Sequence, residues 1–208
     1  MQRPIAATAG LHRRRELVAE ALRLEWLTLG WIAIEAAVSL GAGIIAHSLT
    51  LLAFGADSII ELVSAGVLLW RLKVELGAGD EFPATVEDRA ARAGSVLLIA
   101  LAIYVLATAG WSLAERTGQE FSFAGLAVAV AAIPVMAVLA RRKIRIAEQI
   151  GSAALRIDAA ESIACAYLAG VVVIGLAAQW LTEIWWIDSI TSVVLVPFLI
   201  HEALEAWR

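Results

Sequence analysis

Apolar side chains are far more abundant in this chain than a single soluble domain could bury. Of its 208 residues, 61% are hydrophobic and only 17% are charged, whereas soluble domains carry about 25% charged residues. A soluble domain of this length has too little interior for so many apolar side chains. Six bilayer-spanning helices of about 20 residues each would use most of them. The composition therefore predicts an all-α, polytopic membrane protein.

Six apolar windows divide the chain. They cover residues of about 25–46, 50–72, 94–114, 122–140, 152–179 and 185–205. Residues 1–24 lack the short apolar run and small-residue cleavage site of a signal peptide. We therefore expect a cytoplasmic N-terminal segment over 1–24 and a six-helix transmembrane domain over 25–205. The connections are short, so we expect no soluble domain between the helices and no C-terminal soluble domain.

Basic residues are distributed unevenly among the connections. They gather in the N-terminal segment and in the second and fourth connections, while the first, third and fifth together hold one Lys or Arg, Arg116. Positive charge is retained on the cytoplasmic side, so both termini are predicted to be cytoplasmic in a multi-pass protein of the cell (inner or plasma) membrane. The net charge of −4 gives no basic surface for nucleic acid.

Two segments half a chain apart resemble each other. Residues 48–66 and 152–170 are identical at seven of nineteen aligned positions, and Asp57 falls on Glu161. An offset of three helices would make the copies enter the membrane from opposite sides, so we predict an inverted 3+3 repeat, a common transporter plan. Small, apolar helices also match by chance, and the flanking helices show no comparable match.

Acidic side chains lie inside two of these repeated windows. Asp57 and Glu61 are four residues apart, and Asp158, Glu161 and Cys165 follow at i, i+3 and i+7, so each set shares one helix face. An acid at the bilayer centre costs about 2.5–3.5 kcal/mol. No Lys or Arg lies deep in either window, so we expect a cation from outside the chain. The hypothesis is a four-ligand metal site of Asp57, Glu61, Glu161 and Cys165, with Asp158 as a fifth ligand or an entry-path carboxylate.

Other interpretations of these residues stay open. A membrane acid can be protonated and hydrogen-bonded to a neighbouring carbonyl, and Cys165 can be an inert small apolar residue. Glu35, at mid-depth in the first window, is a supporting partner of the ligands, a proton carrier or a neutral packing acid. His47 and His201 stand at helix ends, where a solvated histidine is the default.

With these residues in view, the chain resembles the cation diffusion facilitator (cation efflux) family. The similarity is carried by IEAAVSLGAGIIAHSLTLLAFGADSIIE, RRKIRIAEQIGSAALRIDAAES and WWIDSITSVVLVPFLIHEALE. It implies six membrane helices with cytoplasmic termini, a homodimer, and export of divalent metal in exchange for protons. The family's transport site has two pairs of ligands. Asp57 and Glu61 match the first pair, and Glu161 and Cys165 match the second.

The chain departs from the family pattern at three of these four positions. Glu61 stands where aspartate is usual, Glu161 where histidine or aspartate is usual, and Cys165 where aspartate is usual. The resemblance also implies a cytoplasmic domain after the sixth helix, which we do not expect here.

These observations predict a secondary transporter of divalent transition metals, and not an enzyme, because no nucleophile–base pair lies in the core. Carboxylates with a thiolate favour zinc, with cobalt, cadmium, iron or manganese as further substrates. Protons are the expected coupling ion, since metal binding must release them from the ligands. The alternative is a non-transporting metal sensor or structural clamp of the same fold.

Overall fold

The chain is an α-helical protein throughout the part that the computed structural model describes, which is residues 3–46, 49–78, 82–116, 122–182, 186–194 and 196–205. These residues contain no β-strand, which confirms the predicted all-α class. The helices are α1 (Arg3–Ile45), α2 (Leu49–Ala78), α3 (Ala84–Glu115), α4 (Phe123–Ile150), α5 (Ala153–Thr182), α6 (Ile187–Val194) and α7 (Val196–Glu205).

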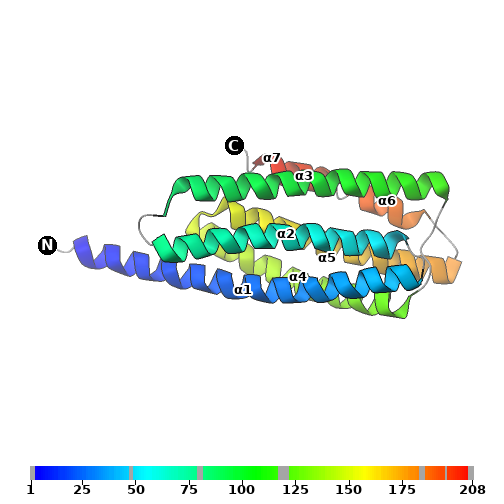
Figure 1. Ribbon diagram of the computed structural model, residues 1–208, viewed down its shortest axis with the longest axis horizontal. Helices are drawn as coiled ribbons and strands as arrows, with labels where there is room; N and C mark the ends of the chain where they lie inside the picture. The colour runs from blue at the N-terminus through cyan, green and yellow to red at the C-terminus, as the bar shows by residue number, and fades with distance from the viewer. Residues whose placement is uncertain are drawn as a thin grey trace.

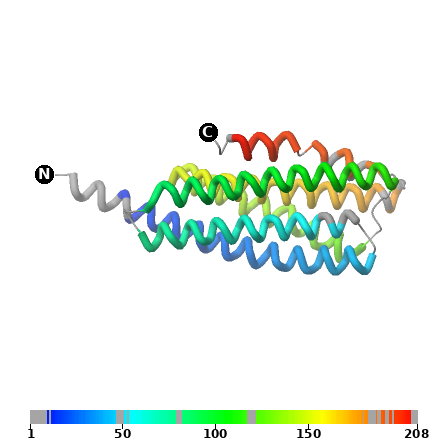
Figure 2. Tube along the Cα trace, turned by 45° about the horizontal axis from the view of Figure 1, so that its top comes forward, coloured from blue at the N-terminus to red at the C-terminus, as the bar shows by residue number. Residues whose placement is uncertain are grey.

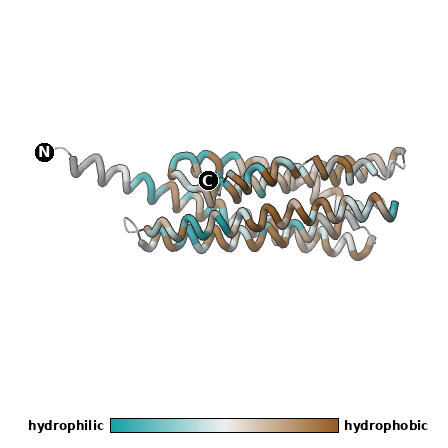
Figure 3. The backbone as a smooth tube through the Cα atoms, turned by 90° about the horizontal axis from the view of Figure 1, so that it is seen from above, coloured by the Kyte–Doolittle hydropathy of each residue, from teal (hydrophilic) through white to brown (hydrophobic). Residues whose placement is uncertain are grey.

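The helices lie side by side in one elongated bundle (Figure 1). α1 packs against α2 and α4, and α4 packs against α5. α3 contacts α2 and α5, and Figure 2 shows α7 lying alongside it. α1 begins and α7 ends at the same end of the bundle, where α2 ends and α3 begins and where α4 ends and α5 begins (Figure 1). We name this the charged end, because hydrophilic residues gather mainly towards it (Figure 3).

Several helices extend well beyond the apolar windows. α1 begins at Arg3, so most of the expected N-terminal segment continues the first helix, and α4 runs through residues 141–149, which were expected to form a connection. Arg, Lys, Glu and Ala are good helix formers, so polarity ends an apolar window without ending the helix. α4 stops where Gly151 adopts the left-handed conformation (φ 66°, ψ 39°), the backbone geometry that commonly terminates helices.

By length and composition, four helices among the described residues can cross a membrane: α1, α3, α4 and α5. The expected window 185–205 is divided between the shorter helices α6 and α7. α2 runs along the bundle between α1 and α3. The structure thus describes a helical membrane protein, and a count of six spans stays a prediction.

The two helices of the predicted repeat have matching lengths. α2 and α5 each contain 30 residues, and their first residues, Leu49 and Ala153, are separated by the offset of 104. The two helices run in opposite directions (Figure 1), as an inverted repeat requires. The repeat of three-helix halves stays a prediction.

Close approach of α3 to α5 depends on a glycine. A Cβ atom at Gly94 would lie 2.8 Å from Cγ2 of Ile157, a separation that real Cβ atoms do not adopt. Small residues allow membrane helices to pack closely in this way. This contact allows α3 to pack closely against α5, which carries half of the candidate site.

Candidate functional site

The acidic pair of α2 faces the interior of the bundle. Asp57 and Glu61 lie one turn apart on the same helix face, and each is only 3% exposed. Ser58, on the same turn, is fully buried. The apolar residues Ile59 and Val63 of α2 are exposed instead, as expected for the side of a membrane helix that meets lipid. The hydropathy pattern thus directs the acids inward.

α5 buries its acids and its thiol inside the bundle. Asp158, Glu161 and Cys165 are 2%, 3% and 1% exposed. The hydroxyl of Ser162 donates a hydrogen bond of 3.2 Å to Glu61 Oε1 and so joins the two helices. The structure therefore brings the two pairs predicted from sequence into one buried region, at the interface between α2 and α5.

Glu35 of α1 belongs to the same region. Its carboxylate accepts hydrogen bonds from Trp31 Nε1 (2.9 Å), Ser58 Oγ (2.9 Å) and Cys165 Sγ (3.1 Å). Glu35 is fully buried, and it connects α1 to both helices of the site. The contacts place Glu35 beside the thiol of Cys165, and its role as a supporting partner, a proton carrier or a packing acid stays a prediction.

Two oxygen atoms of the α2 acidic pair have no hydrogen-bond donor among the described residues. They are Asp57 Oδ2 and Glu61 Oε2, whereas the carboxylate of Glu161 interacts with Ser64 of α2. A buried acceptor without a partner costs about 1–3 kcal/mol, so a cation reaching this region would find unsatisfied ligands. Within the described part of the chain, however, no three His, Cys, Asp or Glu side chains are grouped closely enough to hold a metal ion. The potential ligands are near one another without forming a complete coordination shell.

Asp158 differs from the other acids because it has a basic partner within the chain. Lys143 Nζ lies 2.5 Å from Asp158 Oδ2 and 3.1 Å from Glu25 Oε2, and all three residues are buried. The expectation that the countercharge comes from outside the chain is therefore wrong for Asp158. The expected connection over residues 141–149 is helical here, and this places Lys143 on an inward face. Arg156, the nearest base expected from sequence, is half-exposed and pairs with Glu202 at 3.5 Å.

The sequence contained a signal for Lys143 that the apolar windows do not detect. Lys143, Ile146, Ala147 and Ile150 are buried in α4 at the i, i+3, i+4, i+7 spacing of one helix face. Arg141 and Arg142, beside Lys143 in the sequence, are exposed. Periodicity separates the buried base from the exposed ones, whereas counting charges does not.

A second set of charges lies closer to the charged end. Arg71 is fully buried and pairs with Glu75 and, at 2.5 Å, with Glu87. Glu75 also pairs with Arg14 at 2.7 Å, and Glu87 accepts a hydrogen bond of 2.9 Å from Ser152. These contacts connect α1, α2 and α3 to the start of α5.

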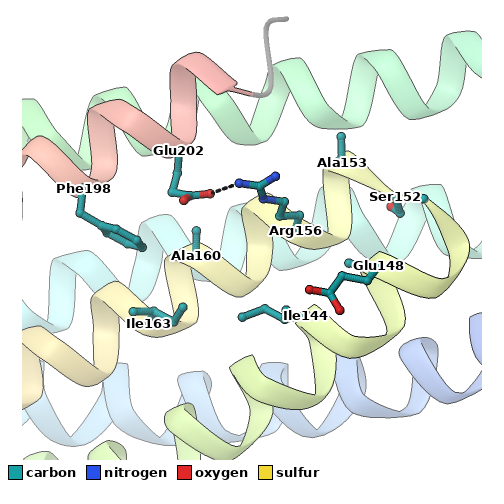
Figure 4. A pocket seen from close by; sticks show the side chains of 11 residues that line it. Ile144, Glu148, Ser152, Ala153, Arg156, Ala160, Ile163, Phe198 and Glu202 are labelled. Carbon is teal, nitrogen blue, oxygen red and sulfur yellow. Dashed lines mark ion pairs between the residues drawn. The ribbon is translucent and has the colours of Figure 1, made fainter.

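A cavity of about 640 Å³ lies between α4, α5 and α7. Figure 4 shows Arg156 and Glu202 at one side of it, with Ile163 and Phe198 at the other. Neither the acids of α2 nor Cys165 lines it. This cavity is therefore separate from the candidate site.

The fold and the site together define a helical membrane protein with buried, incompletely paired carboxylates at its centre. The sequence matches the cation efflux transmembrane domain over residues 26–208, and the chain therefore belongs to the cation efflux family. Membership means that the chain is a transporter of metal cations, which confirms the resemblance noted from its residues. No curated protein matches the chain.

Proposed function

We propose that this protein is a secondary transporter that exports divalent transition-metal cations through a site formed by Asp57, Glu61, Glu161 and Cys165. The observation that carries the proposal is the burial of Asp57, Glu61 and Glu161 on facing helices, where Asp57 Oδ2 and Glu61 Oε2 have no donor among the described residues. They lie in the same region as the one thiol of the chain, which Glu35 holds by a hydrogen bond. A divalent cation would supply the positive charge that these residues lack.

The donor set favours a borderline-soft metal. Three carboxylates alone suit hard ions such as manganese, while a thiolate favours zinc, cobalt and cadmium. Zinc accepts mixed oxygen and sulfur ligands in a tetrahedron, so zinc is the proposed main substrate. Iron and manganese are further candidates.

The proposed mechanism of binding and transport starts from the separation of the potential ligands in this structure. Because the side chains are near one another without forming a shell, the metal would draw α2 and α5 together when it binds. Metal binding releases protons from carboxylic acids and from the thiol, which supplies the proposed exchange for protons. Rocking of the bundle about this central site would then expose it to each side of the membrane in turn.

Orientation and assembly complete the proposal. The charged end, where most Lys and Arg residues lie, would face the cytoplasm, and the protein would reside in the cell membrane. We propose a homodimer through contacts of the membrane helices. A mass in lipid nanodiscs that corresponds to two chains is expected, and a strictly monomeric mass would contradict the proposal.

Transport into proteoliposomes with an imposed pH gradient tests the function. We expect uptake of zinc, accelerated by the gradient, and loss of uptake in Asp57→Asn and Glu161→Gln, which keep side-chain size while removing a charge. Glu148→Gln is the matched control, because Glu148 is an exposed acid of α4 outside the site. Binding of zinc without uptake would identify a sensor or clamp instead. Uptake by both site variants at the parent rate would refute the four-ligand site.

A further inference from the structure

Lys143 forms an internal ion cluster that holds three helices together. Its ammonium group, carried by α4, contacts Asp158 of α5 and Glu25 of α1 at 2.5 and 3.1 Å. The side chains of Lys143 and Glu25 are 0% exposed and that of Asp158 is 2% exposed. Removing one member of a buried ion pair leaves an uncompensated charge, which is strongly unfavourable. The three helices therefore cannot separate at this level while the cluster is intact.

The cluster lies between the candidate site and the charged end. Asp158 is one helical turn closer to that end than Glu161, and Glu25 lies about 15 Å along α1 from Glu35 at a rise of about 1.5 Å per residue. The layer formed by Arg71, Glu75 and Glu87 lies beyond it. A cation that moves through the bundle between the site and the charged end along α4 and α5 would therefore come close to Lys143.

We propose that Lys143 is a positioning residue of the transport cycle, whose ion pairs with Asp158 and Glu25 keep the path from the charged end to the metal site closed. This inference rests on the proposed transport function. Passage of metal requires Asp158 to exchange the ammonium for another cation, which frees α4 from α5. The arriving metal has the charge to make this exchange, so the gate would open when substrate enters.

Cys165 provides a reporter for this gate, because it is the one cysteine of the chain and is 1% exposed. A membrane-impermeant cationic methanethiosulfonate would be applied to inside-out and to right-side-out vesicles. We expect Lys143→Gln to raise the rate of Cys165 labelling from the charged-end face by about tenfold or more, since it shifts the population towards the open state. Labelling from the opposite face should not rise.

Lys73→Gln is the matched control, because Lys73 is the other lysine of the chain, is exposed, and lies 5.4 Å from the Trp26 ring. Cys165 in this variant should be labelled at the same rate as in the parent protein. Exchanging the charges, with Lys143→Asp and Asp158→Lys together, should restore slow labelling. Asp158→Asn tests the same contact if Lys143→Gln does not reach the membrane. If the rate of Cys165 labelling in these variants rises from both faces, or from neither, the proposed gate is wrong.

The measurement separates this inference from the function on which it rests. Labelling needs no metal, so the gate is tested even in a protein that does not transport. Protection of Cys165 by zinc in the parent reports the proposed metal site independently. If Cys165 is labelled faster from the charged-end face alone but zinc does not protect it, the gate is supported and Cys165 is not a metal ligand.

Discussion

At the scale of single residues, Cys165 is the feature that most distinguishes this site. Its thiol donates to Glu35, so the protein places a sulfur atom among carboxylates and fixes its orientation. Sulfur ligands favour soft ions, and carboxylates favour hard ones. Metal preference should therefore depend on this one side chain.

We expect Cys165→Asp to keep transport and to lower the cadmium-to-manganese ratio by about tenfold, which corresponds to about 1.4 kcal/mol of lost preference. Zinc uptake should decrease less than cadmium uptake, because zinc also binds oxygen ligands well. Cys165→Ser is the control for geometry, since its hydroxyl can also donate to Glu35. The measurement is uptake of each metal by proteoliposomes. An unchanged ratio in both variants would show that Cys165 does not contact the metal.

Glu35 should stabilise the protein because its carboxylate accepts hydrogen bonds from three side chains. Glu35→Ala leaves Trp31 Nε1, Ser58 Oγ and Cys165 Sγ without this acceptor, at a cost of about 1–3 kcal/mol for a buried group left unpaired. Glu35→Gln keeps an acceptor oxygen and should cost less. Thermal unfolding in detergent, followed by tryptophan fluorescence, measures the difference. Equal midpoints for the two variants would contradict this role.

At the scale of helices, the packing of α3 on α5 depends on the absence of a side chain at Gly94. Gly94→Ala places a methyl group against Ile157 Cγ2, and such overpacking typically costs about 1–3 kcal/mol. Gly110→Ala in the same helix is the control, because nothing lies within 4 Å of its added Cβ. We expect a lower unfolding midpoint for the first and no loss for the second. Ile157→Ala should destabilise less when combined with Gly94→Ala than alone.

Most helices, but not their contacts, could be predicted from the sequence. Hydropathy locates α5 closely and the end of α3, but α3 begins ten residues before its window. The spacing of Asp57 with Glu61 already places these two acids on one face. The partner of Asp158 was missed because α4 extends through a charged segment that hydropathy assigns to a connection. The hydrogen bonds of Glu35 depend on α1 meeting α2 and α5, which the hydropathy of α1 alone does not predict. A sequence pattern predicts which face of a helix is buried, but it does not predict which helix packs against that face.

At the scale of the whole molecule, the uneven charge predicts how the bundle sits in the membrane. Ala84 and Glu115 are the first and last residues of α3, and both are exposed. In a Cys165→Ser background, we expect an impermeant maleimide outside intact cells to label Glu115→Cys and not Ala84→Cys. Permeabilised cells provide the control, because both positions should then react. The reverse pattern would invert the proposed orientation.

The cluster around Lys143 also bears on how the charged helices could enter the membrane during synthesis. Lys143 and Asp158 lie on either side of the short α4–α5 turn, so these helices can insert as a hairpin whose charges cancel. Inserted singly, each would bear a cost of about 2.5–3.5 kcal/mol for its own charge. Glu25 is made earlier, and its carboxylate has no ammonium beside it until ribosomes have completed α4. The first helix can pack against α2 as soon as α2 is made, but its ion pair with Lys143 forms only when the fourth arrives, which couples early and late parts of the chain during assembly.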